Sequence, residues 1–300
     1  MATQAKARPG RQIVCVGSDR GSVQKLYEQI QPNLQKLLQE TMRADRLLQI
    51  VNHTLLSTPR LAECSKASFV SAIVTCGKTG LVPGPRGLCW FIPRRTGPLD
   101  SMTGQKSWEC HWQVGYKGVL ELAYRSPRIA RIQARAVREG DKFIYDFGED
   151  YIIHQAKPNP EGEARPFTHA YARGWIRGVE KPNWEVMEAW EVERRRDFGG
   201  YKPGGRSPWD GAFAEAMWLK TAAVKLCKYL PASEEMLSAV AIDERSTSGD
   251  RQEIEPEASE ILDELGLEYE PPEEQGDDGT GEPQDGGDLI PRDEPPKEGA

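Results

Sequence analysis

The segment Ser65–Pro83, SKASFVSAIVTCGKTGLVP, decides how the chain is interpreted, because it fits either a buried helix or half of a phosphate-binding loop. A phosphate loop has the pattern G-x-x-x-x-G-K-[ST], and its helix begins at the second glycine. Gly77-Lys78-Thr79 supplies the second half, but Ala72 stands where the first glycine is required. A Cβ there hinders the close backbone approach that glycine permits. A P-loop ATPase is therefore the weaker interpretation.

The same segment carries the signals of a helix. Ser65 is a suitable N-cap, Gly80 a suitable left-handed C-cap, and Pro83 prevents the helix from resuming. Helical spacing places three apolar residues on one face, namely Phe69, Ile73 and Cys76. Lys78 would then lie in the last turn, where a cation complements the helix dipole. The β-branched residues between 70 and 75 leave a strand as the alternative.

Periodicity along the rest of the chain predicts an α+β fold, with an antiparallel β-sheet or hairpin core flanked by helices. Leucines recur at three- and four-residue intervals through residues 23–59, which predicts two helices. Residues 86–190 alternate as strands, with a hairpin over 88–114 and further strands at 128–138, 143–147 and 170–177. Helices are expected after residue 115, before the Arg194–Arg196 run and over 209–229, the last following a Gly- and Pro-rich linker.

Charge divides the chain into a basic body and an acidic tail. Residues 241–300 hold 21 of the 46 acidic and 4 of the 39 basic residues, a net charge of −17, which leaves +10 for residues 1–240. We expect a disordered arm over 1–22, a folded body over 23–240 and a mostly disordered tail over 241–300. The asymmetry favours a body that binds a polyanion and a tail that competes with it or recruits a partner. A tail that serves solubility alone is the alternative.

A short amphipathic helix is expected near residues 259–268 of the tail. Ser259 would be its cap, and three apolar residues would anchor it on a partner protein, namely Ile261, Leu262 and Leu265.

Several classes of protein are not supported. No apolar run approaches the roughly 18 residues of a membrane span, and no signal-peptide core is present, so a cytoplasmic protein is expected. The six cysteines form no C-x-x-C pair and the four histidines are scattered, so we expect no disulfide framework, metal site or cofactor. Catalytic motifs such as H-E-x-x-H and G-x-S-x-G are missing, so we expect no catalytic residue.

Arginine and aromatic residues interleave on two of the expected strands. Cations can hold phosphates while aromatic rings stack on bases, as in sites for single-stranded nucleic acid. Tyr171 and Trp175 are candidates for stacking, although Trp175 suits the core equally well. The candidate backbone contacts are Lys117, Arg131, Arg135, Arg173, Arg177, Arg196, Lys202, Arg206, Lys220, Lys225 and Lys228. A merely solvated face is the alternative for each group.

The chain resembles the RecT family of phage-type single-strand annealing proteins. The resemblance rests on LLSTPRLAECSKASFVSAIVTCGKTGLVPGPRGLCWFIPRR, WQVGYKGVLELAYRS, VREGDKFIYDFGED, the region of HQAKP, and SPWDGAFAEAMWLKTAAVKLCKYLP. These stretches occur in family order between Thr41 and Pro231. The segment Glu191–Ser207 departs from the family pattern, because it is richer in arginine and glycine.

The resemblance implies annealing of complementary DNA strands without ATP during phage recombination. It also implies rings or helical filaments of identical subunits, an annealed duplex intermediate, and the bacterial cytoplasm as the place of action. A 5′→3′ exonuclease and the host single-strand-binding protein are the implied partners, the latter contacted by the C-terminal region. A module that binds and protects single-stranded DNA without annealing it shares the same basic features and stays open at this point.

Overall fold

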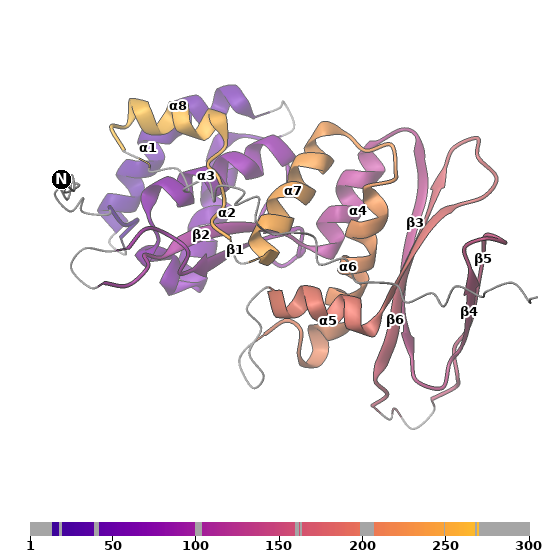
Figure 1. The fold of residues 1–300 in the computed structure, drawn as a ribbon. Coiled ribbons are helices and arrows are strands. Elements are labelled where there is room, and N and C mark those ends of the chain that lie inside the picture. Colours follow the sequence, from indigo (N-terminus) through magenta and orange to yellow (C-terminus); the bar gives the residue numbers. More distant parts are fainter. Residues whose placement is uncertain are drawn as a thin grey trace, which may run out of the picture.

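The computed structural model describes residues 14–17, 20–38, 42–99, 104–159, 162, 164–198, 207–248, 250–267 and 269. Within these residues the chain is α+β, with helices and antiparallel strands, as the periodicity predicts. Figure 1 shows a helical part around α3 (Lys66–Thr79) at one end and a sheet of long strands at the other. Helices α4 (Tyr116–Arg125), α6 (Ala214–Cys227) and α7 (Glu234–Ser248) lie between the two ends. No helix in the described ranges is both long and apolar enough to cross a membrane.

The opening segment forms α3 (Lys66–Thr79), the most buried helix of the N-terminal part. The Ser65 hydroxyl accepts a hydrogen bond from the amide of Ser68, and Gly80 ends the helix with a left-handed φ of 63°. The helix prediction is confirmed, and the strand alternative is wrong. Because α3 is buried on nearly all sides, its β-branched residues face neighbouring elements and a one-sided apolar stripe is missing.

Helices α1 (Arg20–Leu37) and α2 (Ala44–Ser57) and the short 3-10 helix η1 (Pro59–Glu63) complete the N-terminal layer. Residues 14–17 also belong to it. The amide of Val16 donates to the carbonyl of Cys64 at 2.9 Å, and the Val16 side chain is fully buried. The fold therefore begins earlier than residue 23, because this apolar segment pairs with the chain just before α3. Residues 1–13 of the expected arm lie outside the described residues.

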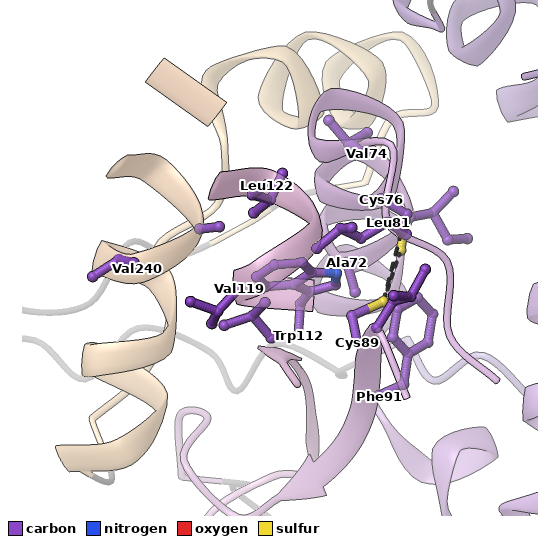
Figure 2. Close-up of a cluster of buried hydrophobic side chains, with 14 of the residues drawn as sticks. Ala72, Val74, Cys76, Leu81, Cys89, Phe91, Trp112, Val119, Leu122 and Val240 are labelled. Atoms are coloured by element: carbon purple, nitrogen blue, oxygen red, sulfur yellow. Dashed lines mark hydrogen bonds between the residues drawn. The ribbon is translucent and has the colours of Figure 1, made fainter. Parts of the chain in front are cut away.

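Strands β1 (Cys89–Arg94) and β2 (Glu109–Val114) form the predicted hairpin, in a register that joins Cys89 to Val114 and Arg94 to Glu109. Figure 2 shows Trp112 of β2 among side chains of α3, α4 (Tyr116–Arg125) and α7 (Glu234–Ser248). The thiols of Cys76 and Cys89 lie 3.9 Å apart in this cluster, joined by a hydrogen bond and not by a disulfide. This apolar centre joins the N-terminal layer to the helices that follow.

The second half of the fold is a three-stranded antiparallel sheet in the order β3-β6-β7, formed by β3 (Ile129–Arg138), β6 (Phe167–Ile176) and β7 (Asn183–Glu188). Strands β4 (Lys142–Asp146) and β5 (Tyr151–Gln155) form a separate hairpin. The chain continues through α5 (Ala189–Phe198), the short η2 (Gly211–Phe213) and α6 (Ala214–Cys227), which packs on the sheet. Gly174 permits this packing, because a Cβ there would lie 3.3 Å from Leu226 of α6 and 2.8 Å from Leu230 just after the helix.

The C-terminal part of the fold extends well past residue 240. Helix α7 runs to Ser248, and α8 (Pro256–Glu264) packs on α3. Between them, the side-chain amide of Gln252 accepts from the amide of Trp112 and donates to its carbonyl, so it pairs with the backbone of β2. Arg251 also pairs with Glu109 at 2.7 Å. Residues 250–267 and 269 thus form a strap across the core, which was not predicted because its acidic composition matches that of a disordered tail.

The short helix expected near residues 259–268 occurs in the structure as α8, but its apolar face is turned inward. Ile261 and Leu262 are buried in the main core, and Leu265 packs against it. These three residues were predicted to anchor a partner protein, but in the structure they anchor α8 to the core. An amphipathic pattern fits a helix that docks on a partner protein and a helix that docks on its own chain equally well. Here the helix docks on the core of its own chain.

Candidate nucleic-acid interface

The β3-β6-β7 sheet has one apolar face and one face of arginine and aromatic residues. Pairing in β3 and β6 sets Arg131 opposite Trp175, Gln133 opposite Arg173, and Arg135 opposite Tyr171. Because directly paired residues of antiparallel strands point to the same side, these six side chains share one face. The opposite face carries Ala134, Ala172 and Gly174, and α6 packs on it. The outer face in Figure 1 is the one turned away from α4 and α6.

One end of this outer face is open. The Cζ atom of Arg131 lies 5.2 Å from the centre of the Trp175 ring, and Arg131 also donates to Gln133. A cation over an aromatic ring is attracted by about 0.5–1 kcal/mol at an exposed site. The contact holds the guanidinium beside the indole. A group that can bind a phosphate therefore lies next to a ring that can stack on a base. Arg131 and Arg135 are exposed, and Trp175 is partly exposed.

The other end of the face is covered by the β4–β5 hairpin. Tyr171, Val137 and Val186 are buried beneath Phe143, Tyr145, Ile152 and Trp184. The rings of Phe143 and Tyr171 stack at 5.5 Å. Burial raises the pKa of the Tyr171 hydroxyl, although Arg173 and Arg135 oppose that effect. Tyr171 is therefore not a free platform for a base, which corrects the stacking assignment from the sequence. Of the two aromatic candidates, Trp175 keeps an accessible ring.

Arg173 joins the hairpin to the sheet. Its guanidinium donates to the carbonyl of Ile152 at 2.7 Å and lies 5.4 Å from the centre of the Tyr171 ring. It is half-buried at the boundary between the covered and open ends. Arg177 follows β6 and is exposed. Lys117 is exposed in the first turn of α4, outside the sheet face.

Asp141 fixes the base of the β4–β5 hairpin. Its carboxylate accepts hydrogen bonds from the amides of Arg138 and Lys157 and contacts His154 and Arg165. Burial alone would raise the pKa of Asp141, but these hydrogen bonds hold it well below its usual range. His154 also contacts the Tyr171 hydroxyl at 3.2 Å. Asp141 is not among the residues predicted from the sequence, although its place in the Glu139-Gly140-Asp141 turn between two strands is typical of an aspartate that accepts backbone hydrogen bonds.

Ion pairs divide the predicted basic residues into two groups. Lys220 is buried and pairs with Asp243 at 2.6 Å. Lys228 pairs with Glu244 at 2.7 Å, Lys225 with Glu185 and Glu191, and Arg196 with Glu193 and Asp197. The expected lysine face of α6 is thus neutralised within the fold, and Lys220 is unavailable to a phosphate. The sequence could not show this, because the carboxylates come from distant segments.

The second group has no carboxylate within 4 Å in the described part of the chain. It consists of Lys117, Arg131, Arg135, Arg173 and Arg177. Four of the five lie on β3 and β6 or directly after them. Lys202 and Arg206 fall outside the described residues. The structure therefore concentrates the uncompensated positive charge of the predicted set on the outer face of the sheet.

The half phosphate loop does not have the geometry of a nucleotide site. Gly77 lies inside α3, and the helix ends at Thr79, whereas a phosphate loop needs a helix that begins there. The Lys78 ammonium pairs with Glu255 at 2.6 Å and with Glu257 at 3.0 Å. Partial burial lowers the pKa of Lys78, but the combined effect of the two carboxylates is larger and opposite, so the pKa is raised. Lys78 ties α3 to the C-terminal strap.

Comparison with known proteins decides the family. The family model for RecT matches residues 42–259, which is well over half of the chain. The chain belongs to the RecT family. It is also 36% identical to Protein RecT of Escherichia coli (strain K12) over 223 residues, 74% of this chain and 77% of that protein. The family match runs past Pro231 through α7 and into α8, in agreement with the folded strap.

Membership of the RecT family makes the chain a DNA-recombination protein that binds and anneals single-stranded DNA. An annealing protein of this family has to hold a polyanion without reading its sequence. The open end of the β3–β6 face offers guanidinium groups and an indole, and none of the described carboxylates lies within 4 Å of these guanidinium groups. Such groups contact phosphates and base faces rather than the pairing edges of bases.

Proposed function

We propose that this RecT-family chain anneals complementary DNA strands without ATP, as an oligomer, and that the outer face of β3 and β6 holds the backbone of the first strand. The observation that carries the proposal is the set of uncompensated arginines on that face, Arg131, Arg135, Arg173 and Arg177, beside the partly exposed ring of Trp175. Lys117 belongs to the proposed contacts as a residue next to the face. The paired residues Arg196, Lys220, Lys225 and Lys228 are no longer included.

Annealing on such a surface needs no covalent catalyst. Two strands repel each other through their phosphates, and a protein that neutralises one of them lowers that repulsion and releases counterions. If arginines hold the backbone and the indole supports a base from its face, the pairing edges stay exposed to a second strand. Correct pairs then accumulate into a duplex intermediate, whereas mismatched strands dissociate. The energy comes from base pairing, so nucleotide hydrolysis has no step to drive.

Oligomerisation would let many weak contacts act together. The outer side of the β4–β5 hairpin supports this part of the proposal, since it exposes three large apolar side chains, Ile144, Tyr151 and Ile153. Replacing Ile144 and Ile153 by serine should shift the protein to smaller species in multi-angle light scattering, with the far-UV circular dichroism unchanged. An unchanged size distribution would remove the hairpin from the subunit contact.

We now propose the partner role of the tail for its last residues only, 270–300. Residues 270–300 hold 11 acidic and 2 basic residues and lie beyond the strap that packs on α3. We assign to them the competition with DNA or the recruitment of a host single-strand-binding protein and a 5′→3′ exonuclease. We further propose that these activities take place in the bacterial cytoplasm and that the protein comes from a phage or prophage.

An annealing assay tests the proposed function. Two complementary oligonucleotides, one with a fluorophore and one with a quencher, are mixed with the protein in buffer without nucleotide. We expect pairing to be accelerated well above the spontaneous rate, and addition of ATP to change nothing. Tight binding of one strand without acceleration would instead show a passive binding module. Acceleration only with ATP would support the P-loop alternative.

A further inference from the structure

A second arginine-aromatic cluster lies at the end of the β1–β2 hairpin. The Cζ atoms of Arg60 in η1 and Arg95 after β1 lie over the indole of Trp108, at 4.9 and 4.8 Å from the ring centre. Trp108 precedes β2 and is partly buried against the core. The β1–β2 hairpin and η1 therefore meet at one ring, and none of these three residues is among the site residues predicted from the sequence.

The two guanidinium groups are close together without a neutralising group. Since both lie within 5 Å of the same ring centre, they are at most about 10 Å apart. Neither has a carboxylate within 4 Å among the described residues, and Arg95 donates to the neutral Gln105. Both side chains are exposed, and the exposed Lys106 follows Gln105. Attraction to the indole opposes the repulsion between the like charges and holds the pair in place.

Two other exposed arginines of the N-terminal half lie beside carboxylates. Arg43 pairs with Asp45 at 3.1 Å, and Arg86 lies 3.9 Å from Glu121. Their charges are compensated locally, whereas those of Arg60 and Arg95 are not. An anion at the indole would supply the missing negative charge, and adjacent phosphates of a strand provide two such charges at a short spacing.

The cluster is separate from the β3–β6 face. The β1–β2 hairpin and the β3-β6-β7 sheet share no strand, and α4, α6 and α7 lie between them in Figure 1. A strand held only on the β3–β6 face has no reason to depend on Arg60 or Arg95, so an effect of these residues on DNA binding would report a second contact region.

We propose that Arg60 and Arg95, positioned by Trp108, form a second site for the sugar-phosphate backbone of single-stranded DNA. The site rests on the proposed function in that it takes the same class of ligand. Trp108 acts as a positioning residue, because its ring already carries the two guanidinium groups. Each arginine keeps N–H donors for phosphate oxygens, to which guanidinium binds well.

The test compares two double variants that remove the same charge from exposed side chains. R60A/R95A removes the uncompensated pair, and R43A/R86A removes two arginines that lie beside carboxylates. Binding of a fluorescent 30-mer of single-stranded DNA is followed by anisotropy from 50 to 300 mM salt. For R60A/R95A we expect affinity at 100 mM salt to fall on the order of tenfold, and the slope of log K against log salt to flatten by about 1.4 for two lost contacts.

R43A/R86A should change affinity less than threefold and keep the wild-type slope, while R60K/R95K should keep the slope because the charge remains. If R60A/R95A behaves like R43A/R86A, the site does not exist. If R60K/R95K loses the slope as fully as R60A/R95A, the effect comes from structural damage and the proposal is equally overturned. Thermal melting of each variant verifies the fold.

Failure of this site is distinguishable from failure of the proposed function. Wild-type annealing is measured in the same buffer with the same oligonucleotides. A wild-type protein that neither binds nor anneals removes the proposed function. A wild-type protein that anneals, together with an R60A/R95A variant that binds like the control, removes the second site alone.

Discussion

His111 is a buried titratable residue of the β1–β2 hairpin. Its Nε2 lies 2.6 Å from the Thr96 hydroxyl, and its Nδ1 lies 3.4 Å from the Ser246 hydroxyl. Burial, with smaller contributions from Arg94 and Arg251, lowers the pKa of His111 to about 3. The imidazole is therefore neutral in the folded protein near pH 7.

This pKa predicts a loss of stability on acidification. In the unfolded chain a histidine binds a proton below about pH 6.5, whereas folded His111 does so only near pH 3. Between these values the unfolded state holds more protons, so the free energy of unfolding falls as pH falls, by up to about 1.4 kcal/mol per pH unit. His111→Gln should remove this part of the slope. Urea unfolding at pH 7, 6 and 5 compares the two proteins.

The raised pKa values of Glu109 and Asp243 act in the opposite direction, because the folded state keeps those protons to a higher pH than the unfolded state. Both groups are present in wild type and in His111→Gln, so the difference between the two pH profiles isolates the histidine. Parallel profiles from pH 7 to 5 would show that His111 is protonated in the folded protein.

Lys78→Ala separates the two interpretations of the opening segment at the scale of one residue. The lysine pairs with Glu255 and Glu257 and is about one third exposed, so its loss should cost at most about 1 kcal/mol in the free energy of unfolding. Annealing without nucleotide should stay within twofold of wild type. Loss of annealing in a variant that unfolds at the same urea concentration as wild type would show that Lys78 acts directly in annealing and is not only a tie between α3 and the strap.

At the scale of elements, the C-terminal strap predicts that two truncations of the chain differ in melting temperature. Ending the chain after residue 269 keeps α8 and should leave the melting temperature unchanged. Ending it after residue 249 removes the buried side chains of Ala258, Ile261 and Leu262. Full burial of one such large side chain contributes about 1.5–3 kcal/mol, so the shorter protein should lose several kcal/mol and melt well below wild type. Differential scanning calorimetry measures both.

The truncations also separate the strap from the acidic residues beyond it. If residues 270–300 compete with DNA, the protein ending at 269 should bind single-stranded DNA as tightly as the full chain or more tightly. Equal melting temperatures for the two truncations would contradict the structural role of residues 250–269.

The elements differ in how far the sequence predicts them. α3 was predictable because Ser65 and Gly80 mark its ends, and the β1–β2 hairpin because Trp108 to Val114 alternates cleanly. The arginine face of β3 and β6 followed from the same alternation. α8 was predicted as a helix, but its apolar face was assigned to a partner protein and not to the core of the chain. An amphipathic pattern does not indicate which surface the helix packs on.

Across the whole molecule, long-range pairing is what the sequence could not supply. A lysine on α6 and an acid on α7 give no sign that they meet, yet Lys220 and Asp243 form a buried pair. The cover over Tyr171 likewise depends on how the β4–β5 hairpin folds onto the sheet. Charge counts therefore identified a basic body, but only the structure separates free cations from neutralised ones.

The central claim is that the free cations on the β3–β6 face, rather than all exposed basic residues, hold DNA. R131A/R135A removes two arginines without carboxylate partners, and K181A/K228A removes two exposed lysines that pair with Asp150 and Glu244. The most direct measurement is the salt dependence of single-stranded DNA binding by both variants. R131A/R135A should bind more weakly and flatten the slope of log K against log salt by about 1.4, whereas K181A/K228A should match wild type. Equal slopes for R131A/R135A and wild type would contradict the account.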